Sequence, residues 1–139
     1  MLDDKFVENA FSEAGWWKDE NIYFLGLVVK PGWKVALEHV NMYAALASKN
    51  TYALINKTED GIAIIPLKLE KTDFVLLQQL SSFIPNAEIQ GVEIKNAFMA
   101  KKVVVRTHSG KPSSFTVEKK NGRILQHESN FMKFLSMYS

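Results

Sequence analysis

The sequence predicts an α+β protein, with an antiparallel β-sheet, a helix at the C-terminal end of the chain and a helical segment before the sheet. Apolar side chains recur at helical spacing in residues 3–14 and again in residues 126–138. Between residues 51 and 118, short apolar runs are separated by turn residues, as in hairpins. Apolar residues make up 47% of the chain, the proportion of an ordinary folded domain. The chain has neither an internal repeat nor a linker, so residues 1–139 are expected to form a single domain.

Residues 1–50 are expected to form a helical addition to the sheet. Asp3 or Asp4 can accept a hydrogen bond from the first free N–H groups of the helix predicted over residues 3–14. Gly15 follows, where glycine commonly ends a helix.

The apolar run 22–29 is compatible with a strand or with a buried helical stretch. Pro31 and Gly32 end this run. Residues 33–48, which are rich in Ala and Leu, favour a second helix.

The sheet is expected to begin with a hairpin. Its strands are residues 52–55 and 62–65, joined by the polar residues 56–61. Pro66 is expected to end the second strand, because proline cannot donate to a ladder. Residues 74–83 stay ambiguous, because their apolar side chains give only a weak helical stripe.

Three further strands and a helix complete the prediction. The strands cover residues 88–95, 102–108 and 114–118, and the apolar spacing of the first indicates a bend at Gly91. The closing helix covers about residues 126–138 and has an apolar stripe along one side.

Several short segments within these elements resemble segments of a known family. They are Tyr52–Asn56, Gly61–Pro66, Ile84–Val92, Thr107–Lys111, Phe115–Val117 and Asn130–Leu135. Over residues 51–139 the chain thereby resembles the bacterial pleckstrin-homology-like (PH-like) domains. The resemblance implies a strongly bent antiparallel sheet, or partly open barrel, capped by the C-terminal helix. It implies a fold more than a function, because such domains bind lipids, peptides or proteins.

The resemblance also bears on lipid binding. In phosphoinositide-binding members, Lys and Arg cluster around the loop of the first hairpin, which we assign to residues 57–61. Glu59 and Asp60 would repel a phosphate there and offset Lys57, so headgroup binding at this place is not expected. The N-terminal helix does not favour a membrane partner either, because its polar face is mainly acidic.

Composition limits the classes of partner and compartment. Seventeen basic and fifteen acidic side chains leave a net charge of +2, too small to indicate nucleic acid or an anionic membrane as an obligatory partner. The charge is uneven, at −2 for residues 1–69 and +4 for residues 70–139. The chain has no cysteine and no apolar signal segment, so a cytoplasmic location is expected.

The sequence shows no catalytic or metal-binding motif. His39, His108 and His127 are not at the spacing with which a helix binds zinc. Gly110 and Lys111 lack the rest of a phosphate-binding loop, so a turn is expected there. We therefore expect no enzymatic activity, no cofactor and no metal.

A basic group in the C-terminal half is the first candidate binding site. If Val103 and Val105 face the core, Lys102 and Arg106 share the outer face of one strand. Such a patch can attract an acidic protein segment or a phosphate backbone. The alternative is that these charges only keep strand edges soluble and unpaired. The group consists of Lys101, Lys102, Arg106, Lys111, Lys119, Lys120 and Arg123.

Three tryptophans, Trp16, Trp17 and Trp33, are the second candidate. Packing between the N-terminal segment and the sheet is the simpler interpretation. The other is an exposed anchor for a partner or a second subunit, since Trp is enriched at interface hot spots.

Two functional hypotheses follow from the sequence. The leading one is a non-catalytic PH-like binding or assembly module that engages a protein partner, or its own copies, through a sheet edge or an aromatic patch. The alternative is weak binding of nucleic acid or anionic lipid through the basic C-terminal half.

Overall fold

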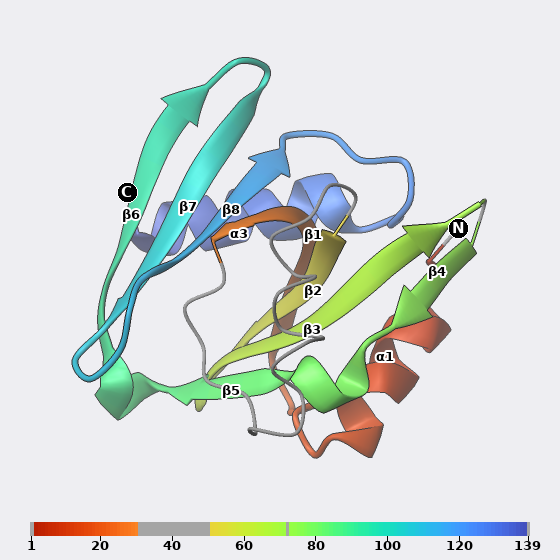
Figure 1. Cartoon of the computed structure of the whole chain (residues 1–139), viewed down its shortest axis with the longest axis horizontal. Coiled ribbons are helices and arrows are strands. Elements are labelled where there is room, and N and C mark those ends of the chain that lie inside the picture. Colours follow the sequence, from red (N-terminus) through yellow and green to blue (C-terminus); the bar gives the residue numbers. More distant parts are fainter. Residues whose placement is uncertain (1, 31–50, 72, 139) are drawn as a thin grey trace.

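The computed structural model describes residues 2–30, 51–71 and 73–138. Eight strands form one antiparallel sheet in the order β4-β3-β2-β1-β8-β7-β6, and β5 pairs with β3 beside β4 (Figure 1). This arrangement confirms the predicted α+β class. The elements are α1 (Asp4–Glu13), β1 (Asn21–Lys30), β2 (Thr51–Thr58), β3 (Gly61–Glu70), β4 (Asp73–Leu76), η2 (Gln78–Leu80), β5 (Ser82–Pro85), η3 (Asn86–Glu88), β6 (Ile89–Ala97), β7 (Ala100–Thr107), β8 (Ser113–Glu118) and α3 (His127–Tyr138).

Each face of the sheet has its own core. Helix α3 packs on one face, where Phe131 and Phe134 join buried residues of β1, β2, β3, β7 and β8. Helix α1 contributes Val7, Ala10 and Phe11 to a second cluster, with residues of β1, β2 and β3. The two helices therefore cover opposite faces of the central strands. No helix in the described ranges is long and apolar enough to cross a bilayer.

Helix α1 forms as predicted from its caps. The Asp3 carboxylate accepts a hydrogen bond from Phe6 N at 2.8 Å, which satisfies one of the free N–H groups of the first turn. Gly15 follows the helix with φ of 80°, a conformation that glycine adopts without steric cost. Trp16 N then donates to Phe11 O at 2.8 Å and fixes the chain as it leaves the helix.

The apolar run 22–29 is a strand, β1, and it lies in the middle of the sheet between β2 and β8. The expectation that residues 1–50 form only a helical addition is therefore wrong, because the sheet begins at Asn21. Phe24 faces one core and Leu25 the other, so both faces of β1 are buried over residues 23–26, whereas Leu27 and Val29 are exposed. Because both faces are buried there, the run shows no alternation. The helix predicted over residues 33–48 lies outside the described residues.

The first predicted hairpin is longer and tighter than expected. Strand β2 continues through Thr58 and β3 begins at Gly61, so Glu59 and Asp60 alone form the turn. Pro66 does not end β3, contrary to the prediction. Strand β5 pairs with residues 61–64 of β3 and β4 pairs with residues 67–70. Pro66 lies between these two ladders, at a gap that tolerates a residue without an N–H group.

Residues 57–61 do not form the loop of the first hairpin, contrary to the assignment on which lipid binding was excluded. Strands β1 and β2 form the first antiparallel pair, and residues 31–50 join them. The turn at Glu59 and Asp60 belongs to the next hairpin. Its acidic character therefore does not bear on the first hairpin of the chain.

The ambiguous residues 74–83 form two short strands, β4 and β5, separated by the single turn η2. Strands β6, β7 and β8 and helix α3 confirm the predictions for the C-terminal half. The register of β6 shifts between Ile89 and Gly91, which confirms the bend expected at this glycine.

Candidate binding surface

The basic residues predicted as a site lie in several places. Lys101 and Lys102 begin β7, and Lys119 and Lys120 follow the end of β8. Pairing of Ala100 with Glu118 brings these two ends together. Lys119 and Lys120, but not Lys101 or Lys102, line a groove of about 640 Å³ together with Phe98, Met99, Ala100, Thr116 and Glu118.

Arg106 shares the outer face of β7 with Lys102, as predicted, because Val103 and Val105 face the core beneath α3. Its guanidinium Nε donates to Glu93 Oε1 at 2.6 Å. This hydrogen bond raises the pKa of Arg106 and lowers the pKa of Glu93. Lys95 Nζ lies 3.7 Å from the same carboxylate. Glu93 thus offsets part of the positive charge on this face.

Lys111 and Arg123 lie apart from the four lysines. Lys111 is in the turn between β7 and β8, at the opposite end of β7 from Lys101. Arg123 places its guanidinium 5.7 Å from the ring centroid of Tyr52 and 5.9 Å from that of Phe74, on β2 and β4. The sequence-predicted basic group therefore does not form one continuous patch.

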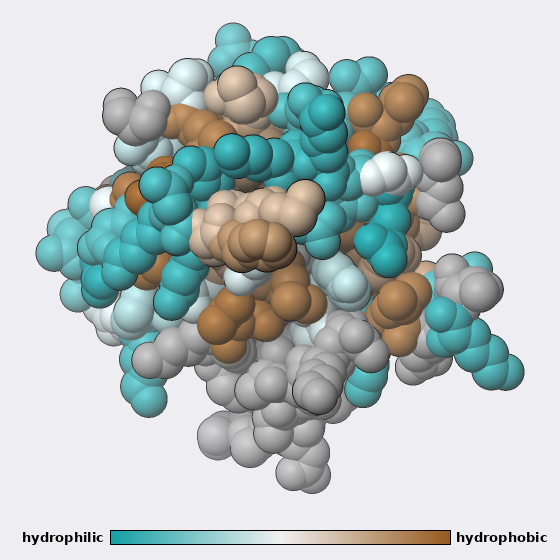
Figure 2. Space-filling model, turned by 90° about the horizontal axis from the view of Figure 1, so that it is seen from above, coloured by the Kyte–Doolittle hydropathy of each residue, from teal (hydrophilic) through white to brown (hydrophobic). Residues whose placement is uncertain are grey.

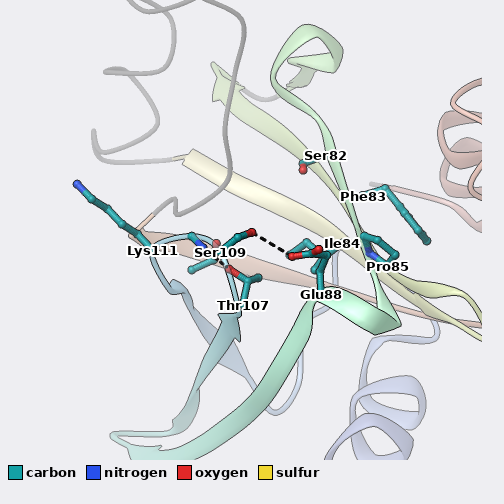
Figure 3. A pocket seen from close by; sticks show the side chains of 10 residues that line it. Ser82, Phe83, Ile84, Pro85, Glu88, Thr107, Ser109 and Lys111 are labelled. Carbon is teal, nitrogen blue, oxygen red and sulfur yellow. Dashed lines mark hydrogen bonds between the residues drawn. The ribbon is translucent and has the colours of Figure 1, made fainter.

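A second cleft, of about 250 Å³, has Lys111 among its lining residues (Figure 3). One wall is β5, with Phe83 and Ile84, and the facing wall is the turn after β7. Ser109 Oγ donates to Glu88 Oε2 at 3.0 Å across the cleft. Gly110 N donates to Thr107 Oγ1 at 3.1 Å, which confirms that Gly110 and Lys111 belong to a turn. Lys111 points away from this hydrogen-bonded pair in Figure 3.

The tip of the β6–β7 hairpin carries two exposed apolar side chains that the sequence analysis did not single out. Ala97 pairs with Ala100, so Phe98 and Met99 alone form the turn. Phe98 is 92% exposed and Met99 is 77% exposed. Met99 also has φ of 54°, in the left-handed region. The signal was present as two large apolar residues where turn residues are usual.

Trp16 and Trp17 pack as the simpler interpretation predicts. The Trp16 ring stacks on Phe83 with centroids 6.0 Å apart, and Trp17 lies 5.8 Å from Tyr23. Both are half-buried against the cluster under α1. Trp33 lies outside the described residues.

A buried polar group anchors the loop that carries Trp16. Asn56 Nδ2 donates to Trp16 O at 3.1 Å and to Asn21 Oδ1 at 3.0 Å. Its neighbour Lys57, expected in an exposed loop, is buried and donates to Thr58 O at 2.5 Å. Burial lowers the pKa of Lys57, and the nearby Glu59 and Asp60 oppose this effect. These contacts hold the turn in place and leave Lys57 enclosed.

His127 is fully buried at the start of α3 and links three elements. Leu25 N donates to its Nδ1 at 3.2 Å, so Nε2 carries the proton and donates to Glu118 O at 2.6 Å. Protonation of Nδ1 would break the bond from β1. Burial lowers the pKa of His127, whereas the Glu118 carbonyl and the charges of Glu118 and Glu128 act in the opposite direction.

We expect the free energy of unfolding to fall as the pH drops below about 6.5, the ordinary pKa of histidine. The unfolded chain takes up a proton on His127 there, and the folded chain only at lower pH, so the stabilisation is fully present above that pH. Urea unfolding at about pH 8 and about pH 5 measures this slope. His127→Gln should flatten it and the exposed His108→Gln should not. Equal slopes in all three proteins would contradict the prediction.

The described residues contain no group of three His, Asp or Glu side chains that could hold a metal ion. His39 lies outside them, and His108 is exposed in the turn after β7. The chain matches no protein-family model, no curated protein and no solved structure.

Proposed function

We propose that this chain is a non-catalytic binding module of the PH-like type, with a strongly bent sheet capped by α3. It engages an extended segment of a protein partner, or of a second copy, at the free edge of β6. The sheet order, with β1 between β2 and β8 and a helix on one face, supports the fold. The long edge of β6 is the observation that carries the function.

Among the described strands, β6 pairs with β7 only. It is nine residues long and contains no proline. The strands at the other edge, β4 and β5, have four residues each, and β5 ends at Pro85. Natural proteins blunt sheet edges with short strands, prolines and bulges. The bulge after Ile89 affects only the beginning of β6, so its other residues offer a regular ladder to an added strand.

Apolar side chains beside this edge are incompletely covered. Val92 and Ile94 of β6 and Leu135 and Tyr138 of α3 are half-buried at the margin of the core. An added strand would place alternate side chains on the same face as Val92 and Ile94. Main-chain hydrogen bonds would then provide affinity, and these apolar contacts would provide selectivity.

Selection from a library of random linear peptides tests the proposal. We expect the selected peptides to perturb the amide resonances of β6 more than those of β4. N-methylation at alternate peptide residues should abolish binding, because alternate N–H groups face the neighbouring strand. Methylation at the intervening residues should be tolerated. Light scattering of the chain alone reports whether a second copy occupies the edge.

Two results would contradict β6 as the binding edge. In one, selected peptides perturb other strands and leave β6 unchanged. In the other, a strictly monomeric chain selects no peptide.

A further inference from the structure

We propose that the tip of the β6–β7 hairpin docks on the surface of an anionic lipid bilayer. Phe98 and Met99 enter the boundary between headgroups and acyl chains, and the lysines around them contact the lipid phosphates. This surface is separate from the edge proposed above for a protein segment.

The exposed apolar tip is costly for the chain in two ways. Phe98 is the most exposed large apolar side chain in the described residues, and Met99 is nearly as accessible. The left-handed conformation of Met99 is unfavourable for a residue with a Cβ atom, and Gly or Asn would adopt it more readily. Neither solubility nor turn geometry explains a Phe-Met pair here. A binding role explains both the exposure of this pair and the strain at Met99, since strained positions cluster at functional sites.

Lysines surround this tip on both faces of the hairpin. Lys101 forms a hydrogen bond with Asn96 across the ladder on one face. Lys95 and Lys102 pair with each other on the other face. Lys119 and Lys120 approach from the end of β8 along the groove beside Phe98. Against these five lysines stand the carboxylates of Glu93 and Glu118, so the tip is strongly positive.

The shape of the tip favours a bilayer over a folded protein. The hairpin extends beyond the other strands in Figure 1, and its turn consists of two residues. Figure 2 looks onto this end of the molecule and shows apolar surface flanked by hydrophilic surface. A protein partner would need a matching pocket for a single projecting ring. A bilayer accepts such a wedge at any position, while long lysine side chains reach the headgroups around it.

The acidic N-terminal helix does not conflict with this geometry. Helix α1 covers the β1–β3 part of the sheet, away from the tip. Its charge therefore argues only against docking through α1 itself.

Vesicle co-sedimentation with the full chain tests the proposal. We expect binding to vesicles of phosphatidylcholine with phosphatidylserine, weaker binding to phosphatidylcholine alone, and a decrease with added salt. Phe98→Ser should weaken binding to the anionic vesicles on the order of tenfold or more. The matched control Val75→Ser, an exposed apolar residue of β4 at the other edge of the sheet, should bind as the unchanged chain does.

Two further comparisons separate charge and folding effects. Lys119→Glu with Lys120→Glu should reduce binding on the order of tenfold or more, whereas Lys5→Glu with Lys133→Glu, which changes the net charge equally, should have little effect. Met99→Gly relieves the left-handed strain, so it should keep or raise the melting temperature and still weaken vesicle binding. A merely structural role of Met99 would not produce that combination.

Three outcomes would overturn the proposal. The first is that the chain does not bind phosphatidylserine vesicles. This includes the case in which Phe98→Ser instead loses binding to a protein. The second is full binding by Phe98→Ser. The third is competition by soluble glycerophosphoserine at the concentration of the vesicle headgroups, because an isolated headgroup offers no apolar layer for Phe98.

Discussion

Replacing Phe24 by alanine is expected to lower the free energy of unfolding by roughly 3–5 kcal/mol. The Phe24 side chain is fully buried on β1. Its ring centroid lies 4.8 Å from that of Phe134, 5.2 Å from that of Phe131 and 6.4 Å from that of His127. Truncation would leave a cavity where the central strand meets α3. This loss is a large share of the roughly 5–15 kcal/mol that stabilises a typical domain.

Urea unfolding followed by circular dichroism measures this effect. Phe98→Ala is the matched control, since the same truncation at an exposed ring should change stability by less than about 0.5 kcal/mol. Phe134→Ala, alone and combined with Phe24→Ala, completes a double-mutant cycle. We expect a coupling of about 0.5–3 kcal/mol between these rings. Similar losses for Phe24→Ala and Phe98→Ala would contradict the packing of α3 on β1.

The sequence alone was sufficient to predict the elements that are determined by local patterns. Helix α1 has a capping carboxylate at Asp3 and a glycine at its end, and both features are visible in the sequence. Strand β8 has one face under α3, so Phe115 and Val117 follow an alternating pattern that can be read directly. Helix α3 likewise buries one stripe on the sheet. In each case one side of the element faces the core.

Other elements depend on neighbours that are distant in sequence. Strand β1 is covered on both faces over residues 23–26, so its residues are apolar without a period and match a buried helix equally well. Pro66 could stay within β3 only because two different strands pair on either side of it. Asn56 and Lys57 look like loop residues, yet in the folded chain the Asn56 amide Nδ2 donates to Trp16 O and Lys57 Nζ donates to Asn86 Oδ1. Such partners cannot be assigned from local pattern.

The candidate surfaces were predictable only in part. The charges of Lys101, Lys102, Lys119 and Lys120 were visible in the sequence, but their convergence depends on the pairing of β7 with β8. Arg106 was correctly placed on the outer face of β7, whereas its partner Glu93 comes from β6. Phe98 and Met99 are visible in the sequence as two adjacent apolar residues, but their exposure depends on a two-residue turn whose register no local signal fixes.

Replacing Gly61 by alanine is expected to cost more than about 2 kcal/mol of stability. Gly61 begins β3 opposite Pro85 of β5, with φ of 157°, where glycine is favoured. A Cβ atom at this position would lie 2.2 Å from Ile84 O and 2.9 Å from Pro85 Cα. Both are backbone atoms, so the clash cannot be relieved by rotating a side chain. Strand β5 would have to move away from β3.

Gly122→Ala is the matched control for this substitution. A Cβ atom there meets nothing within 4 Å, and the backbone of Gly122 is not in the left-handed region. Alanine should therefore be neutral, or stabilising by about 0.4–1 kcal/mol through a less flexible unfolded chain. Thermal unfolding compares the two variants, and amide resonances of β5 report its displacement in Gly61→Ala. If Gly61→Ala unfolded like Gly122→Ala and left these resonances in place, β5 would not approach β3 as closely as the 2.2 Å contact requires.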